Sequence, residues 1–180
     1  GGGMACYDDS SPNIINVIID NNIVNTSNMY SRAGGGGISC DYESHPTLEN
    51  VIISNNTVNL LSGYDESGGG GLWCFDSDLT IVNVLIENNT VNFAGCGMNT
   101  IGGGGVFFKS SNSIVDSTTI SNNLLSSGNN CNGQDNIGGG GFLSMYSNIV
   151  LNNVIIENNV ADFAGLGGGM YLGDSSPTLT

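Results

Sequence analysis

Short apolar segments rich in β-branched residues recur along the chain, and polar residues separate them. Val-Ile-Ile or Val-Leu-Ile stands at residues 17–19, 51–53, 84–86 and 154–156, and Thr-Thr-Ile takes the equivalent place at 118–120. One residue after each segment comes an Asn-Asn pair. Short β-branched runs that end in Asn predict strands bounded by tight turns.

Two independent markers repeat with the same period. Blocks of glycine end at residues 3, 37, 71, 105, 141 and 169, with spacings of 34, 34, 34, 36 and 28 residues. The Asn pairs begin at residues 21, 55, 88, 122 and 158, with spacings of 34, 33, 34 and 36. The chain is therefore one structural unit of about 34 residues that is repeated about five times.

The local chemistry of the unit selects an all-β solenoid. Four consecutive glycines would each cost a helix about 1 kcal/mol relative to alanine, which excludes helical repeats. A propeller blade needs about 40 residues and four strands, whereas each unit here offers two or three short strands and one loop of variable length. We expect a single parallel β-helix over 1–180 with coils at about 1–33, 34–67, 68–101, 102–137 and 138–166, and a partial coil at 167–180.

Alternation within the strand after each glycine block assigns its residues to two faces. The inward positions hold apolar residues, followed two places later by Cys6, Cys40 and Cys74, which we expect to form a buried ladder of free thiols. The outward positions hold Ser39, Trp73, Phe107, Leu143 and Tyr171. Two interpretations are open: a neighbouring segment covers this stripe, or Trp73, Phe107, Leu143 and Tyr171 bind a partner protein or carbohydrate.

The asparagine pairs have two physical reasons to recur at corners. Asparagine tolerates the left-handed backbone conformation of a sharp bend. Its amide can also bond to the asparagine one coil above, which gives a ladder along the axis. We expect such ladders from both columns, Asn21, Asn55, Asn88, Asn122 and Asn158, and Asn22, Asn56, Asn89, Asn123 and Asn159.

The charge balance excludes several classes of partner. The chain has 16 acidic and 2 basic residues, a formal net charge of −14. A nucleic-acid partner is excluded because no basic patch exists to displace counterions from phosphates, and anionic membrane surfaces are disfavoured for the same reason. No apolar run reaches the length of about 18 residues that a membrane-spanning helix needs, so no membrane insertion is expected.

Two motifs resemble a known family. The glycine blocks run into Ile38, Leu72, Val106 and Phe142, and an Ile-x-x-Asn motif begins at residues 19, 53, 86, 120 and 156. Together they are similar to the Gly-Gly-Ala-aliphatic and Phe-x-x-Asn motifs of polymorphic outer-membrane protein (Pmp-type) repeats. Residues 176–179 read Ser-Pro-Thr-Leu, a stretch common in secreted β-helix repeats. The resemblance implies a right-handed parallel β-helix, extracellular or on the cell surface, and often adhesive.

We therefore expect a non-enzymatic extracellular structural or adhesive rod, part of a surface fibre or filament. The alternative is a carbohydrate-active enzyme or carbohydrate-binding β-helix, with Asp8-Asp9, Asp41 with Glu43, or Asp76 with Asp78 as candidate carboxylate pairs. Solvated strand ends explain these pairs as well, so no catalytic residue is assigned. No cofactor is expected, and a structural calcium site among the acids stays open.

The loops and the ends of the chain add three expectations. Cys96 and Cys131 occupy equivalent places in adjacent loops, which predicts a disulfide in an oxidising compartment. Asn25 begins an Asn-Thr-Ser sequon and is a candidate for glycosylation. The chain starts within a glycine block and stops directly after Ser-Pro-Thr-Leu, so we expect further coils of the same protein, or identical copies end to end, to cover its ends.

Overall fold

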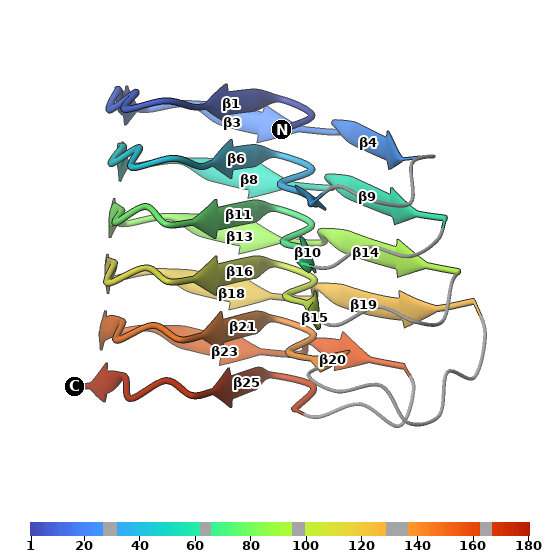
Figure 1. Cartoon of the computed structure of the whole chain (residues 1–180). Helices are drawn as coiled ribbons and strands as arrows, with labels where there is room; N and C mark the ends of the chain where they lie inside the picture. The colour runs from blue at the N-terminus through green and yellow to red at the C-terminus, as the bar shows by residue number, and fades with distance from the viewer. Residues whose placement is uncertain (27–31, 62–65, 95–99, 129–136, 163–166) are drawn as a thin grey trace.

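The computed structural model describes residues 1–26, 32–61, 66–94, 100–128, 137–162 and 167–180. In these ranges every regular element is a β-strand, and all the pairings between strands are parallel. Successive coils lie one above another in Figure 1, and each coil adds one layer to the stack. The all-β parallel solenoid predicted from the sequence is confirmed.

Two of the five sheets contain six strands each. Sheet A consists of β1 (Met4–Cys6), β6 (Ile38–Cys40), β11 (Leu72–Phe75), β16 (Val106–Lys109), β21 (Phe142–Met145) and β25 (Met170–Gly173). Sheet B consists of β2 (Asn13–Ile15), β7 (Thr47–Glu49), β12 (Thr80–Val82), β17 (Ile114–Asp116), β22 (Val150–Asn152) and β26 (Thr178–Leu179).

Two more sheets contain five strands each. Sheet C consists of β3 (Ile18–Asp20), β8 (Ile52–Ser54), β13 (Leu85–Glu87), β18 (Thr119–Ser121) and β23 (Ile155–Glu157). Sheet D consists of β4 (Ile23–Thr26), β9 (Thr57–Leu60), β14 (Thr90–Phe93), β19 (Leu124–Ser127) and β24 (Val160–Ala161). Strands β3 and β4 follow each other in nearly the same direction, while β1 runs the opposite way in front of β3 (Figure 1).

A fifth sheet was not expected from the sequence and lies where each variable loop meets the next glycine block. Sheet E consists of β5 (Ala33–Gly34), β10 (Glu66–Gly68), β15 (Thr100–Gly102) and β20 (Ile137–Gly138). Four coils thus contribute a strand to every sheet, and strands of a fifth coil and the start of a sixth follow. The expectation of two or three strands per coil was wrong, because a complete coil has five strands of two to four residues each, and strands this short carry little periodicity.

The lumen of the solenoid is filled by in-register apolar columns. One cluster combines the inward residues of sheets A, B and C, among them Ile38, Leu48, Ile53 and Phe108, all with no more than 1 % of their surface exposed. Cys6, Cys40 and Cys74 belong to the same cluster and are free thiols, as predicted. A second cluster lies between sheets D and E, with Val58, Val91 and Leu125 from sheet D.

Each coil turns from sheet E to sheet A through a glycine in the left-handed conformation. Gly35, Gly69, Gly103 and Gly139 have φ between 59° and 70°. At Gly103 a Cβ atom would lie 2.0 Å from the carbonyl oxygen of Val106, so a side chain there would clash with the backbone. The glycine blocks therefore fix the corner, because the backbone approaches itself there more closely than a side chain would allow.

Candidate functional site

The outward stripe of sheet A is buried beneath a second layer of the fold. Trp73 has 3 % of its surface exposed and Phe107 and Leu143 have none, while Tyr171 is half-buried against them. The hypothesis of a partner-binding stripe at Trp73, Phe107, Leu143 and Tyr171 is therefore wrong for the first three residues. The other interpretation, that a neighbouring segment covers the stripe, agrees with the structure.

Sheet E packs on this stripe through a column of glycines. A Cβ atom on Gly34 would lie 2.3 Å from the indole ring of Trp73, and one on Gly102 would lie 2.6 Å from Leu143. The bulk of the outward residues on sheet A thus takes the space that side chains on sheet E would need. The large residues of sheet A and the glycines of sheet E therefore pack closely against each other.

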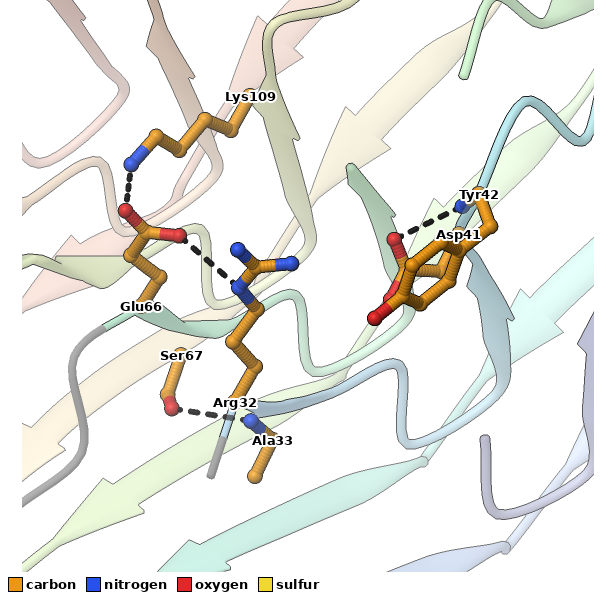
Figure 2. A network of polar contacts seen from close by, with 7 residues as sticks. All are labelled: Arg32, Ala33, Asp41, Tyr42, Glu66, Ser67 and Lys109. Atoms are coloured by element: carbon orange, nitrogen blue, oxygen red, sulfur yellow. Dashed lines mark hydrogen bonds and ion pairs between the residues drawn. The ribbon is translucent and has the colours of Figure 1, made fainter. Parts of the chain in front are cut away.

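The two basic residues of the chain meet at one carboxylate on this face. Glu66 at the start of β10 forms ion pairs with Arg32 and with Lys109, and Figure 2 shows its carboxylate between them. Arg32 Nε lies 3.2 Å from Glu66 Oε2. The side chains of Lys109 and Glu66 are 14 % and 19 % exposed, so this pair is largely shielded from solvent.

Aromatic rings support the cations of this cluster. The guanidinium carbon of Arg32 lies 3.6 Å from the ring centroid of Phe75, and Lys109 Nζ lies 5.6 Å from the same centroid. Lys109 Nζ is also 5.5 Å from the ring of Tyr146. These distances are in the range of cation–π attraction. Both cations are held by Glu66 and by aromatic rings of the protein, and Arg32 also lines a hollow of about 260 Å³ together with Asp41 and Trp73.

Sequence reasoning missed this cluster, although a signal was present. Arg32 and Glu66 both stand two residues before the first glycine of a block, so they occupy the same position on adjacent coils. Lys109 pairs in register with Phe75 on sheet A. Because sheet E itself was not predicted, nothing placed the Arg32 column opposite the Lys109 column.

The second asparagine of each pair forms a continuous ladder through the molecule. The Nδ2 group of Asn56 donates to Asn89 Oδ1 at 3.0 Å, and Asn89 donates to Asn123 Oδ1 at the same distance. Asn22 begins the ladder with a bond of 3.0 Å, and Asn159 ends it with one of 2.9 Å. Asn56, Asn89 and Asn123 are no more than 1 % exposed. The predicted ladder therefore exists in this column.

The first asparagine of each pair does not form a ladder, which corrects the prediction for that column. Asn21, Asn55, Asn88, Asn122 and Asn158 are exposed and have φ between 54° and 57°. Among the described residues no hydrogen bond links one amide of this column to the next. Asn21 and Asn55 bond instead to the carboxylate of Asp20, the latter at 2.7 Å. These residues are therefore suited to the left-handed corner rather than to amide stacking.

Two further polar ladders were not predicted. On the outer side of sheet D, Asn59 donates to Asn25 at 2.8 Å and Asn92 donates to Asn59 at 2.9 Å. In the first of these bonds the acceptor is Asn25 Oδ1. Glycosylation of Asn25 stays a prediction. At the turn between sheets A and B, buried serines accept bonds from the backbone one coil earlier, for example Ser44 N–H to Ser77 Oγ at 3.1 Å and Ser111 N–H to Ser147 Oγ at 3.0 Å.

The stacked thiols differ in acidity along the column. A hydrogen bond with the Cys40 thiol lowers the pKa of Cys6 to about 7, and the same bond raises the pKa of Cys40. Burial raises the pKa of Cys74, whose Sγ donates to the carbonyl of Ser77 at 2.8 Å. Cys96 and Cys131 lie outside the described residues, so their disulfide stays a prediction.

The candidate carboxylate pairs lie at turns, and the carboxylates of Asp41 and Asp78 bond to the backbone. Asp8, Asp9 and Asp76 have positive φ at the turn after sheet A. Asp78 Oδ1 accepts from the N–H of Asn112 at 2.6 Å. Asp41 Oδ1 accepts from the N–H of Tyr42 at 2.9 Å, and burial raises the pKa of Asp41.

Neither a metal-ligand set nor a membrane-spanning helix is found in the described parts of the chain. No group of three or more His, Cys, Asp and Glu side chains there is arranged to hold a metal ion. The described residues also include no helix that is long and apolar enough to cross a membrane. The calcium expectation from the sequence therefore gains no support from these residues.

These features define a class of protein, a parallel β-solenoid whose recurring polar side chains bond from coil to coil. A family model described as the right-handed beta helix region matches residues 2–180, so the chain belongs to that family. No curated protein and no solved structure matches the chain.

Proposed function

We propose that this β-helix is a non-enzymatic structural or adhesive rod of the cell exterior. The observation that carries the proposal is that its repeated polar residues form hydrogen bonds between coils. Asn56, Asn89 and Asn123 are buried and bond along the axis, so they hold coils together rather than face a ligand. The finer likeness to Pmp-type repeats, and with it the surface location, rests on the glycine and Ile-x-x-Asn motifs alone.

The arrangement of charge also favours a rod over an enzyme. Anionic polysaccharides are bound by cationic side chains, yet Arg32 and Lys109 both form ion pairs with Glu66. Carboxylates that act as acid and base on a glycosidic bond face each other across the substrate, about 5–9.5 Å apart. Asp78 instead bonds to the backbone of the next coil at 2.6 Å.

The last coils of the solenoid suit continuation of the stack. Leu151, Val154, Ile156, Met170 and Leu179 line a hollow of about 380 Å³ at the last coils, so apolar lumen is open there. The edge strand β25 pairs with β21 on one side only. Further coils of the same protein, or an identical copy, would cover this surface and pair with the open edge.

Activity assays separate the rod from the carbohydrate-active alternative. Purified residues 1–180 are incubated with a panel of neutral and acidic polysaccharides, and released reducing ends and unsaturated products are measured. We expect no product above a heat-denatured control. Release of either product from one polysaccharide would contradict the proposal and favour the enzyme.

Location and assembly need their own measurements. An antibody against residues 1–180 should label intact source cells, and labelling only after permeabilisation would contradict the surface location.

Light scattering of residues 1–180 should show association that grows with concentration. A stable monomer at every concentration would contradict stacking of identical copies through their ends.

A further inference from the structure

The outer side of sheet C carries an aliphatic column that runs the length of the molecule. Strand pairing places its members in register, Ile18 with Ile52, Ile52 with Leu85, Leu85 with Thr119, and Thr119 with Ile155. Ile18 and Ile155 are 68 % and 54 % exposed, and Ile52 and Leu85 are partly exposed. The inward neighbours on the same strands, such as Ile53 and Ile86, fill the lumen, so this column faces away from the core.

Carboxylates stand beside this aliphatic column at alternate coils. Two residues further along the same strands, the outward positions hold Asp20, Ser54, Glu87, Ser121 and Glu157. Asp20 is held by Ser54 Oγ at 2.7 Å, which fixes its carboxylate on this face. With coils about 4.8 Å apart, successive carboxylates are about 10 Å apart.

No described residue of this face balances the negative charge. The only two basic residues, Arg32 and Lys109, form ion pairs with Glu66 at the edge between sheets E and A. The 14 excess carboxylates of the chain therefore set the sign of the field, and sheet C adds three of them to an apolar surface. Such a field attracts cationic partners and speeds their association.

We infer that the outer face of sheet C is a docking surface for a cationic amphipathic helix of another polypeptide. An α-helix advances about 5.4 Å per turn, close to the spacing of about 4.8 Å between coils. One apolar side chain per turn can therefore lie along Ile18, Ile52 and Leu85. Lys or Arg beside the apolar stripe of the helix would reach the carboxylates of Glu87 and Glu157. The inference does not depend on the rod being adhesive.

A second copy of this chain fits the face less well. Two copies joined through sheet C would bring Glu87 and Glu157 of one toward the same acidic column of the other. Like charges in an interface cost affinity, and no lysine or arginine of the face offsets them. The complementary partner is positively charged.

Fluorescence anisotropy tests this docking surface with a defined probe. The probe is a labelled amphipathic helical peptide of about 20 residues made of leucine and lysine, and its scrambled isomer has the same charge but no apolar face. We expect saturable binding of the probe that weakens with salt, and at least about tenfold weaker binding of the isomer. Equal binding of the two peptides would overturn the inference, because it would show attraction by net charge alone.

Paired variants locate the binding on sheet C. Ile52→Thr with Leu85→Thr should weaken probe binding about tenfold, since threonine already occupies this column at residue 119 and keeps the strand intact. Glu87→Gln with Glu157→Gln should weaken it by about as much. The matched controls are Ile114→Thr with Val150→Thr on sheet B, and Glu43→Gln with Asp174→Asn at turns, each expected to change affinity less than about twofold.

The outcomes of these variants are decisive. If a control pair weakened binding as much as its sheet C counterpart, the docking surface would not be sheet C. If the sheet C variants bound the probe like the parent protein while keeping the parent melting temperature, the inference would be wrong. Self-association that Leu85→Thr abolishes would point to a second copy as the occupant and would also overturn it.

Discussion

The two asparagine columns are adjacent in sequence but contribute to the fold through different properties, one through its backbone conformation and the other through its side-chain amide. Asn88 is exposed, has a φ of 56° and bends the chain between sheets C and D. Asn89 is completely buried, donates to Ile53 O and Asn123 Oδ1, and accepts from Asn56. The same residue type is thus used once for its backbone freedom and once for its amide. Recurrence of a residue in a repeat does not by itself say which property is required.

The largest effect should come from breaking the buried column. In Asn89→Leu, the Nδ2 and backbone N–H of Asn56 lose their acceptor, two bonds of 3.0 Å each. The carbonyl of Ile53 loses a donor at 2.9 Å. Because buried polar groups left unpaired cost about 1–3 kcal/mol each, we expect a loss of about 3 kcal/mol or more in the free energy of unfolding. Urea denaturation measures it, and a loss below about 1 kcal/mol would refute the ladder as a stabilising element.

Coupling along the column should be the next largest effect. Asn56→Ala and Asn89→Ala remove partners in one hydrogen-bond network, so their effects should not add, with a coupling energy of about 1 kcal/mol or more. The matched pair Asn55→Ala and Asn88→Ala belongs to the exposed column, where no amide bonds to the next. That pair should add to within about 0.5 kcal/mol, and coupling as strong as in the buried column would remove the distinction between the two.

Substitution by glycine should affect the stability of the protein differently in the two columns. Asn88→Ala should cost about 1 kcal/mol because alanine resists the left-handed conformation, while Asn88→Gly should be close to neutral. At position 89, glycine should be as harmful as alanine, because both remove the amide. Thermal melts of the four variants test this pattern, which would fail if glycine rescued position 89.

The smallest effect should be a pH dependence at the exposed column. Hydrogen bonds from Asn55, Ser54 and Asn21 lower the pKa of Asp20 from its usual 3.8. Its contribution to stability is therefore present above about pH 4 and is lost as the pH falls through the lowered pKa of the folded protein. Asp20→Asn should be less stable than the parent at pH 6, and this difference should shrink as the pH is lowered below 4. A difference that stayed constant over this pH range would contradict this origin.

Much of the solenoid was predictable because its markers repeat. The glycine and asparagine spacings gave the period, and alternation placed Cys40 and Ile38 in the lumen. Sheet E was not predictable, because β5 consists of Ala33 and Gly34 alone and β20 of Ile137 and Gly138. Strands of two residues have no alternation to read, and they exist because the coil below provides partners for their backbone.

The site was less predictable than the fold for the same reason. Trp73 and Phe107 were placed correctly on the outer side of sheet A, but their accessibility depended on a sheet that the sequence did not reveal. The ion pairs of Glu66 join residues from three coils, and only the glycine offset linked two of them. A repeat pattern identifies the residues of successive coils that stack on one another. It does not identify residues of two different sheets that contact each other, because such contacts add no period to the sequence.

The amides of the buried ladder all point the same way. From Asn22 to Asn123, each Nδ2 donates toward the following coil, so the column has an oxygen at its first end and hydrogen donors at its last. The hydrogen bonds of this column therefore all have the same direction along the axis. Any neighbour that prolongs it must present an amide in the same sense. Meeting head to head would set oxygen against oxygen, so copies that share the ladder are related by translation and rotation along one axis and never by a two-fold.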